Sequence, residues 1–210
     1  MNIYELFFTC INIPYKQVGV STNYQTLKKG DTLYIFFQGS NGVNDWKNNF
    51  DFPIKPYKRM GKTVWFAHGG FLRAFKEVEP YLQELLLDKS YSKLVIAGYS
   101  HGAAIASLCH EYIYFNRLDL RNNLLGFGFG CPRVFWGFKI KEIEKRWENF
   151  TVVRNINDLV THLPPAILGY RHVGKMLEIG KQKKYTPVQA HYPENILKEL
   201  KIYEKVIVIP

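Results

Sequence analysis

The sequence has only three cysteines, Cys10, Cys109 and Cys131, which lie far apart and form no C-x-x-C pair. An odd number of widely spaced cysteines argues against a disulfide framework. Reduced cysteines that fill space in a core are typical of proteins kept in a reducing compartment. We therefore expect a cytoplasmic protein whose cysteines serve packing.

Long hydrophobic runs and low-complexity segments are missing as well. No stretch approaches the ~20 apolar residues that a membrane-spanning helix needs. Residues 1–8 lack the basic region and the long apolar core of a signal peptide. No repeat or linker divides the 210 residues, so we expect a single domain over 1–210.

Acidic residues are few compared with basic ones, which gives a formal net charge of +10. The lysines are spread along the chain, with no basic stripe interleaved with stacking aromatics and no recognition helix, so we expect no nucleic-acid partner. A diffuse positive surface instead favours transient contact with anionic lipid head groups. Hydrophobic residues make up 47% of the chain and aromatic residues 16%, which excludes a disordered protein. The oligomeric state is left open.

Short apolar runs alternate with helical patterns along the chain. This alternation predicts an α/β fold with a mostly parallel central sheet and helices on both faces. The expected strands are 32–37, 63–67, 94–97, 124–129, 151–155 and 173–179, with an edge strand at 205–209. The expected helices are 71–87, 101–115, 139–147 and 192–200.

The sequence Gly98-Tyr99-Ser100-His101-Gly102 lies between one of these strands and a helix rich in small residues. A G-x-S-x-G in that position is similar to the nucleophile elbow of α/β-hydrolases, whose strained turn exposes the serine hydroxyl. Glycine is needed on both sides because backbone passes close by. The alternative is an ordinary turn that happens to contain a serine.

A serine nucleophile needs a carboxylate and a histidine, which in α/β-hydrolases follow it in that order. Asp158 lies just past the expected strand 151–155, at the same edge of the sheet as Ser100. We predict that it is the orienting carboxylate. The alternative is that Asp158 only serves an Asn-Asp turn.

Several segments in a fixed order resemble the class 3 lipases, the fungal-lipase-like branch of the α/β-hydrolases. The resemblance covers about residues 31–200 and rests on the segments 33–40, Asp45-Trp46, 68–71, 128–134 and 157–165. The chain has Gln38 where the family usually has arginine, and its elbow departs from the family's G-H-S-L-G-G. The resemblance implies a serine ester hydrolase of the α/β-hydrolase fold.

The resemblance also implies an oxyanion hole made by the backbone N–H groups of Ser40 and His101. Segment 41–61, where the family carries its lid, mixes apolar residues with lysines and an arginine. Because an interfacial lid is a more apolar amphipathic helix, we expect ester hydrolysis in general more than triglyceride lipolysis in particular.

Among the histidines that follow Asp158, His162 is too close in sequence to be aimed at Ser100 independently. His172 resembles a structural histidine of the family, and His191 resembles its base, on a loop before the last helix. We predict His191 as the base and keep His172 as the alternative. Such a triad would carry out two-step acyl transfer on a small-molecule or lipid ester without a metal or organic cofactor.

Two other functions use the same residues. The chain could be a catalytically silent α/β-hydrolase scaffold that binds a lipid or a protein. It could also be a thioesterase or phospholipase that uses the same triad. The intact Ser100, Asp158 and His191 favour an enzyme, and the acyl-chain length of its substrate is left open.

Overall fold

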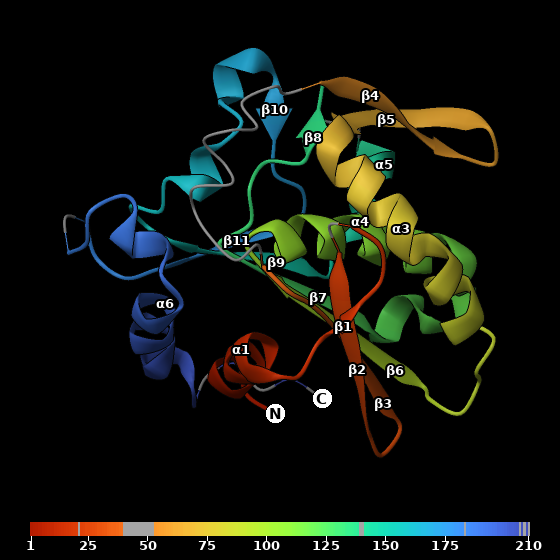
Figure 1. The fold of residues 1–210 in the computed structure, drawn as a ribbon, viewed down its shortest axis with the longest axis horizontal. Helices are drawn as coiled ribbons and strands as arrows, with labels where there is room; N and C mark the ends of the chain where they lie inside the picture. Colours follow the sequence, from red (N-terminus) through yellow and green to blue (C-terminus); the bar gives the residue numbers. More distant parts are fainter. Residues whose placement is uncertain are drawn as a thin grey trace.

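The computed structural model describes residues 1–20, 22–39, 53–138, 141–182, 184–205, 207 and 209. Its centre is a seven-stranded sheet in the order β1-β2-β3-β6-β7-β9-β11 (Figure 1). From β3 to β11 neighbouring strands run parallel, and β1 and β2 extend this edge antiparallel. The strands are β1 Lys16–Gln17, β2 Asn23–Lys29, β3 Thr32–Phe37, β6 Lys93–Tyr99, β7 Leu124–Phe129, β9 Phe150–Asn155 and β11 Lys175–Ile179.

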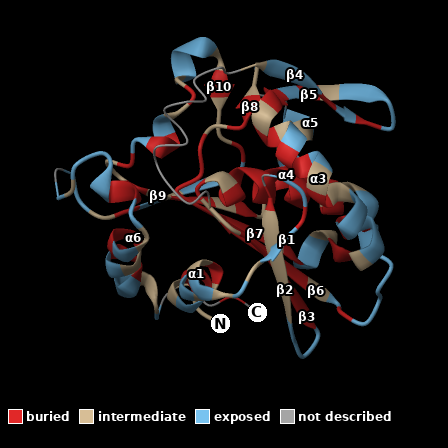
Figure 2. Ribbon diagram, in the orientation of Figure 1, coloured by how far each residue is buried: buried red, intermediate tan, exposed pale blue. Residues whose placement is uncertain are grey.

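Helices cover both faces of this sheet. Helices α3 (Gly69–Leu85) and α4 (His101–Asn116) lie on one face, and α1 (Ile3–Asn12) and α6 (Pro193–Leu200) lie on the other (Figure 1). Strand β3 is buried along its whole length because its side chains alternate between two cores. Ile35 belongs to the core under α3 and α4, and Phe36 to the core under α1 and α6 (Figure 2).

A second, antiparallel sheet has the order β10-β8-β5-β4 and lies beyond the carboxyl ends of the parallel strands (Figure 1). Its strands are β4 Ile54–Arg59, β5 Lys62–His68, β8 Phe135–Trp136 and β10 Tyr170–Arg171. The sequence predicts the strand at 63–67 but not this sheet. Residues 54–59, expected to be part of one loop over 41–61, pair with β5, and 41–52 lie outside the described residues.

The α/β class and the main strands agree with the sequence analysis. Two terminal features differ from it. Helix α1 was not expected, although Asn2 and Glu5 form a capping box across its first turn (2.8 and 3.0 Å). No edge strand is assigned to the described part of 205–209. There the carbonyl of Ile207 accepts from the N–H of Ile3 (3.1 Å), so this end packs along the start of the chain.

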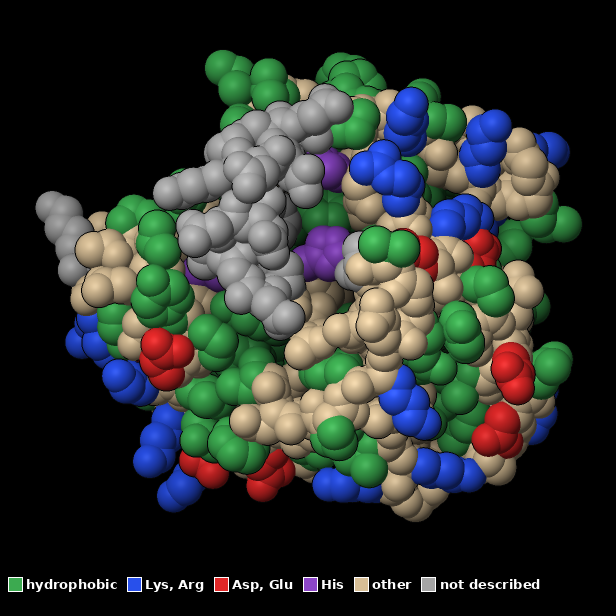
Figure 3. All heavy atoms as spheres, viewed as in Figure 1, with side chains coloured by type: hydrophobic (Ala, Val, Ile, Leu, Met, Phe, Trp, Pro, Cys, Tyr) green, Lys and Arg blue, Asp and Glu red, His purple; other side chains and the backbone are tan. Residues whose placement is uncertain are grey.

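The expected helix over 139–147 is described from 141 onward. It consists of the short helix α5 (Lys141–Glu144) and a 3-10 turn at Lys145–Trp147. Among the helices that the structure describes, none combines the length and the apolar composition required to span a membrane. On the face shown in Figure 3, Lys and Arg side chains gather over the β4–β5 hairpin and the neighbouring part of α3.

Candidate active site

Ser100 occupies the sharp turn between the end of β6 and the start of α4. Its backbone angles, φ 54° and ψ −119°, lie in a region that residues with a side chain rarely adopt. The N–H of Ser100 donates to the carbonyl of Phe129 (2.9 Å), which ties the turn to the neighbouring strand β7. The serine hydroxyl therefore stands at the carboxyl edge of the parallel strands.

Two glycines make this turn sterically feasible. A Cβ on Gly98 would lie 2.2 Å from the carbonyl oxygen of Gly102, and a Cβ on Gly102 would lie 2.3 Å from the carbonyl oxygen of Phe37. No side chain fits at such distances from backbone atoms. The expected elbow geometry is thus present, with glycine required on both sides of Ser100.

Asp158 is fully buried in the turn that follows β9. Its backbone N–H donates to the carbonyl of Asn155 (2.8 Å), and its Oδ1 accepts from the N–H of Val160 (2.9 Å). Thr161 Oγ1 donates to the Asp158 carbonyl (2.8 Å). These bonds fix the carboxylate so that Oδ2 faces His191.

His191 lies between Asp158 and Ser100. It ends a 3-10 turn, Gln189–His191, just before α6. Its Nδ1 is 2.8 Å from Asp158 Oδ2, and its Nε2 is 2.9 Å from Ser100 Oγ. Because a carboxylate only accepts, the ring proton belongs on Nδ1, and Nε2 is left to accept from the serine hydroxyl. Ser100 and His191 are each 3% exposed, so the three side chains form a buried chain of hydrogen bonds.

Three residues that the sequence analysis did not single out hold His191 in place. The Tyr99 hydroxyl donates to the His191 carbonyl (2.7 Å), and its ring stacks on the imidazole at a centroid distance of 5.1 Å. Burial raises the pKa of Tyr99, so this hydroxyl keeps its proton. Asn155 Nδ2 donates to the carbonyl of Ala190 (3.0 Å).

The third is Gly130, whose φ is +57°. A Cβ there would lie 2.7 Å from His191 Cε1 and 3.1 Å from Asp158 Oδ2. Gly130 lies within segment 128–134 and Tyr99 within the elbow, so both could have been found from motifs already noted. No pattern in the sequence pointed to Asn155.

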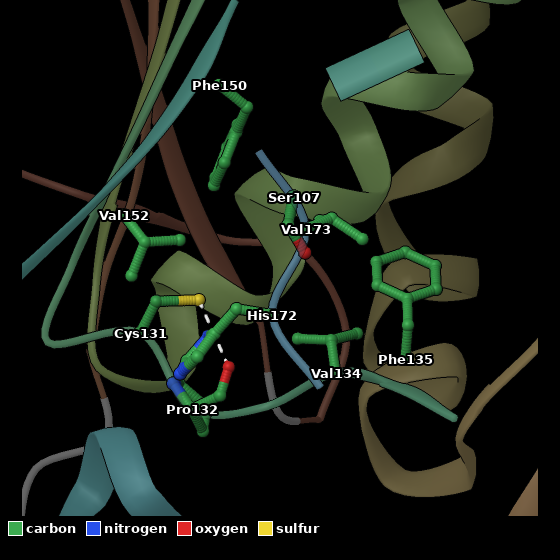
Figure 4. Close-up of a pocket in the computed structure, with 9 residues that line it drawn as sticks. All are labelled: Ser107, Cys131, Pro132, Val134, Phe135, Phe150, Val152, His172 and Val173. Atoms are coloured by element: carbon green, nitrogen blue, oxygen red, sulfur yellow. Dashed lines mark hydrogen bonds between the residues drawn. The ribbon is translucent and has the colours of Figure 1, made fainter. Parts of the chain in front are cut away.

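His172 does not take part in this arrangement. Its Nε2 lies 2.8 Å from the carbonyl oxygen of Thr161, and burial lowers the pKa of its imidazole to about 4. Figure 4 shows it at a small crevice with Cys131 and Phe150, and this crevice is too narrow to admit a water molecule. The position of His172 is that of a packing residue, as the comparison of motifs had suggested.

Of the two residues expected to form the oxyanion hole, His101 lies within the described residues and Ser40 does not. His101 begins α4, and the first N–H groups of a helix have no carbonyl partner within it. Its N–H therefore lies beside Ser100 at the positive end of the helix dipole. Burial against Phe71 lowers the pKa of the His101 ring to about 4, which leaves it uncharged at neutral pH.

The fold and these three side chains define an α/β-hydrolase with a serine-histidine-aspartate arrangement at the sheet edge. The family model for lipase (class 3) matches residues 34–168. The chain therefore belongs to the class 3 lipase family.

Individual relatives agree with this assignment. A lipase of Rhizomucor miehei is 32% identical over 149 residues, which cover 69% of this chain and 40% of that protein. A secreted mono- and diacylglycerol lipase of Fusarium solani is 27% identical over 165 residues, 74% of this chain and 46% of that protein. The chain thus spans less than half the length of these relatives.

Among solved structures, a triacylglycerol lipase described as having a serine protease triad at its catalytic centre superposes with a TM-score of 0.70 at 28% identity. The match covers 80% of this chain and 66% of that one.

The expectation of a cytoplasmic location was wrong. Relatives that match the chain are named as secreted lipases. The three cysteines are free and buried, as expected. Free cysteines in a core carry no information about the compartment, however, because a thiol without a neighbouring cysteine forms no intramolecular disulfide in any compartment.

Proposed function

We propose that the chain is a serine carboxylic ester hydrolase that acts on fatty-acyl esters, acylglycerols among them. The observation that carries this proposal is the position of one imidazole within hydrogen-bond distance of both Ser100 Oγ and Asp158 Oδ2. A base that contacts both the nucleophile and an orienting carboxylate is the arrangement that activates a serine hydroxyl.

In the first step, Nε2 of His191 takes the hydroxyl proton while Ser100 Oγ attacks the carbonyl carbon of the ester. Asp158 stabilises the imidazolium that forms, and its contact with the backbone N–H of Val160 keeps the carboxylate oriented. His191 then gives the proton to the departing alcohol, which leaves an acyl-enzyme. In the second step, His191 takes a proton from water, and the resulting hydroxide attacks the acyl carbon. The bond between this carbon and Ser100 Oγ then breaks, the acid is released, and His191 returns the proton to Ser100 Oγ.

The negative charge that develops on the ester oxygen needs donors beside Ser100. The N–H of His101 lies at the start of α4, where the helix dipole also favours an anion. We assign it as one oxyanion donor and Ser40 as the other. A donor of this kind typically contributes about 3 kcal/mol to lowering the barrier.

Support for the substrate class comes from relatives. The names of the relatives describe lipases and mono- and diacylglycerol lipases, all of which hydrolyse fatty-acyl esters. On one side of the Ser100 elbow, Phe71 also packs on the neutral His101 ring. An uncharged surface beside the nucleophile suits an acyl chain better than an ionic substrate.

Labelling by a fluorophosphonate, followed by hydrolysis of p-nitrophenyl esters of rising chain length, tests the proposal. Ser100→Ala should abolish both while leaving the free energy of unfolding nearly unchanged. Ser107→Ala is the matched control, since Ser107 lies on α4 and its hydroxyl only contacts the carbonyl of Ala104 (2.7 Å). It should keep labelling and activity.

Each outcome decides between functions. Labelling of Ser100→Ala as strong as that of the wild type would exclude Ser100 as the nucleophile. A folded wild-type protein that resists labelling would instead be a silent scaffold. A panel containing a thioester, a phospholipid and a triacylglycerol then ranks the acyl substrates by kcat/KM.

A further inference from the structure

The β4–β5 hairpin is held against helix α4 by the buried side chain of Arg59. Arg59 Nε lies 2.8 Å from Oε2 of Glu111, a fully buried residue of α4. The other oxygen of Glu111 accepts from Arg146, and its Oε2 also accepts from the Tyr57 hydroxyl. The charge of Arg59 is therefore neutralised, and the hairpin is held in one position at this residue.

The other cations of this region have no such partners. Lys58 lies on the face of the hairpin opposite to Tyr57 and Arg59, whereas Lys55 and Lys62 share the face of those two residues. Lys55, Lys58 and Lys62 on the hairpin and Arg73 on α3 are exposed, and we call these four side chains the basic patch. None of the ion pairs within the described part of the chain includes them. The sequence has no Asp or Glu between Pro53 and Lys76. Figure 3 shows blue side chains gathered there, with the nearest red ones lower down on α3.

An exposed apolar surface continues from the basic patch across the second sheet. On the outward face, Phe66 of β5 lies opposite Pro56 of β4 and is 40% exposed. Its ring meets Trp136 of β8 edge-on at 5.9 Å. Trp136 Nε1 in turn donates to the carbonyl of Leu168 (2.7 Å).

The turn Ala166–Leu168 completes this surface. Ile167 is 94% exposed and Leu168 is 53% exposed, so neither side chain contributes to a core. We call Phe66, Trp136, Ile167 and Leu168 the apolar patch. It adjoins the basic patch at Lys58, which is two residues from Pro56 on the same face of β4, and Pro56 pairs with Phe66.

We propose that the two patches together form a docking surface for an anionic lipid layer. Lysines without carboxylate partners are attracted to the negative head groups of such a layer. Exposed phenylalanine, tryptophan and aliphatic side chains next to lysines fit the boundary between head groups and acyl chains. An acidic protein would match the charges but would leave the protruding Ile167 and Leu168 without a deep apolar phase.

The base of the hairpin that carries the docking surface adjoins the proposed active site, so this inference rests on the proposed function. At the base of the hairpin, the carbonyl of Pro53 accepts from the N–H of Gly69, the first residue of α3 (2.7 Å). Two residues on, Phe71 packs against His101, the residue after Ser100 (5.6 Å between ring centroids). A lipid layer held by the hairpin would therefore border the elbow.

Sedimentation with vesicles tests the surface separately from catalysis. Ser100→Ala protein is mixed with vesicles of phosphatidylcholine alone or of phosphatidylcholine and phosphatidylserine in a two-to-one ratio, so that no lipid is consumed. In this background, Lys58→Ala with Lys62→Ala should weaken binding to the anionic vesicles by about ten-fold or more. Ile167→Ser should weaken it by about ten-fold as well.

Matched controls make the same chemical changes elsewhere. Lys198→Ala with Lys201→Ala removes the same charge from exposed positions on and just after α6. Ile202→Ser removes an isoleucine that is 73% exposed. Both controls should bind anionic vesicles like their parent. Added salt should abolish the effect of the hairpin lysines and leave that of Ile167, since only the former is a charge effect.

Equal losses in the two double-lysine variants would show that binding follows net charge, and would overturn the proposal. Equal binding to neutral and anionic vesicles would do the same. Retention on a poly-glutamate column without any vesicle binding would assign the surface to an acidic protein partner instead. In an otherwise wild-type protein, the surface variants should hydrolyse a soluble p-nitrophenyl butyrate normally. Loss of vesicle binding with that activity intact would leave the proposed function standing.

Discussion

The turn that carries Ser100 and the turn that carries His191 meet across a hydrogen bond of 2.9 Å, yet they are built differently. The serine turn is fixed by backbone contacts, which leave room only for glycine at Gly98 and Gly102. The histidine turn is fixed largely by side chains, since Tyr99 and Asn155 bond to its carbonyls. A steric constraint tolerates no substitution, whereas side-chain bonds can be removed one at a time. The serine turn and the histidine turn, the two halves of the site, should therefore respond to mutation in different ways.

The largest effect should come from Gly102→Ala. The added Cβ would lie 2.3 Å from Phe37 O and 2.5 Å from Gln38 O, so β3 or α4 must shift. We expect the free energy of unfolding to fall by about 3 kcal/mol or more, with loss of most activity. Gly30→Ala is the control, because that turn glycine has φ +57° but no atoms within 4 Å of its Cβ position. It should cost about 1 kcal/mol and keep full activity. Similar behaviour of the two variants in urea unfolding would refute the steric account.

On the histidine side, His191→Ala should lower kcat by about four orders of magnitude, because the base of the triad is lost. His172→Ala should change kcat by less than about ten-fold, since its ring contacts the Thr161 carbonyl and not Ser100. Steady-state kinetics on a soluble ester compares the two directly. A severe loss in His172→Ala with a mild one in His191→Ala would reverse the assignment of the base.

The difference between the two halves also explains what the sequence could predict. The elbow is encoded within five consecutive residues, so its strand, turn and helix could all be inferred locally. His191 is 91 residues from Ser100, and its distance from the serine depends on packing that no local pattern records. Its choice over His172 rested on the resemblance to a family. The second sheet escaped prediction for a similar reason, since β8 and β10 are two residues each and exist only through their partners.

A smaller effect should follow from loosening the histidine turn. Tyr99→Phe removes the hydroxyl bond to the His191 carbonyl and keeps the stacked ring. We expect kcat to fall by about ten-fold with KM unchanged, as loss of about one hydrogen bond predicts. Tyr99→Leu removes the stacking as well and should lower kcat further. Tyr15→Phe removes a comparable bond to the Cys10 carbonyl (2.5 Å) and should affect only stability. An equal loss of activity in Tyr15→Phe would show that Tyr99 acts through stability alone.

The smallest effect should be a dependence of stability on pH that arises on the serine side. His110 is buried in α4, the helix that begins at the elbow, and burial lowers the pKa of its imidazole from 6.5 to about 3. Below pH 6.5 the unfolded chain binds a proton at this position that the folded chain does not. The free energy of unfolding therefore falls as the pH falls, by about 1 kcal/mol per pH unit from this residue. In His110→Leu, the loss of stability between about pH 6.5 and 5.5 should be smaller than in the wild type by that amount. The pKa of the more exposed His162 is lowered as well, by burial and by Arg154, so His162→Gln should also reduce the slope, but by less than His110→Leu. Urea unfolding at several pH values measures both slopes, and an unaltered slope in His110→Leu would show that the acid sensitivity does not arise from His110.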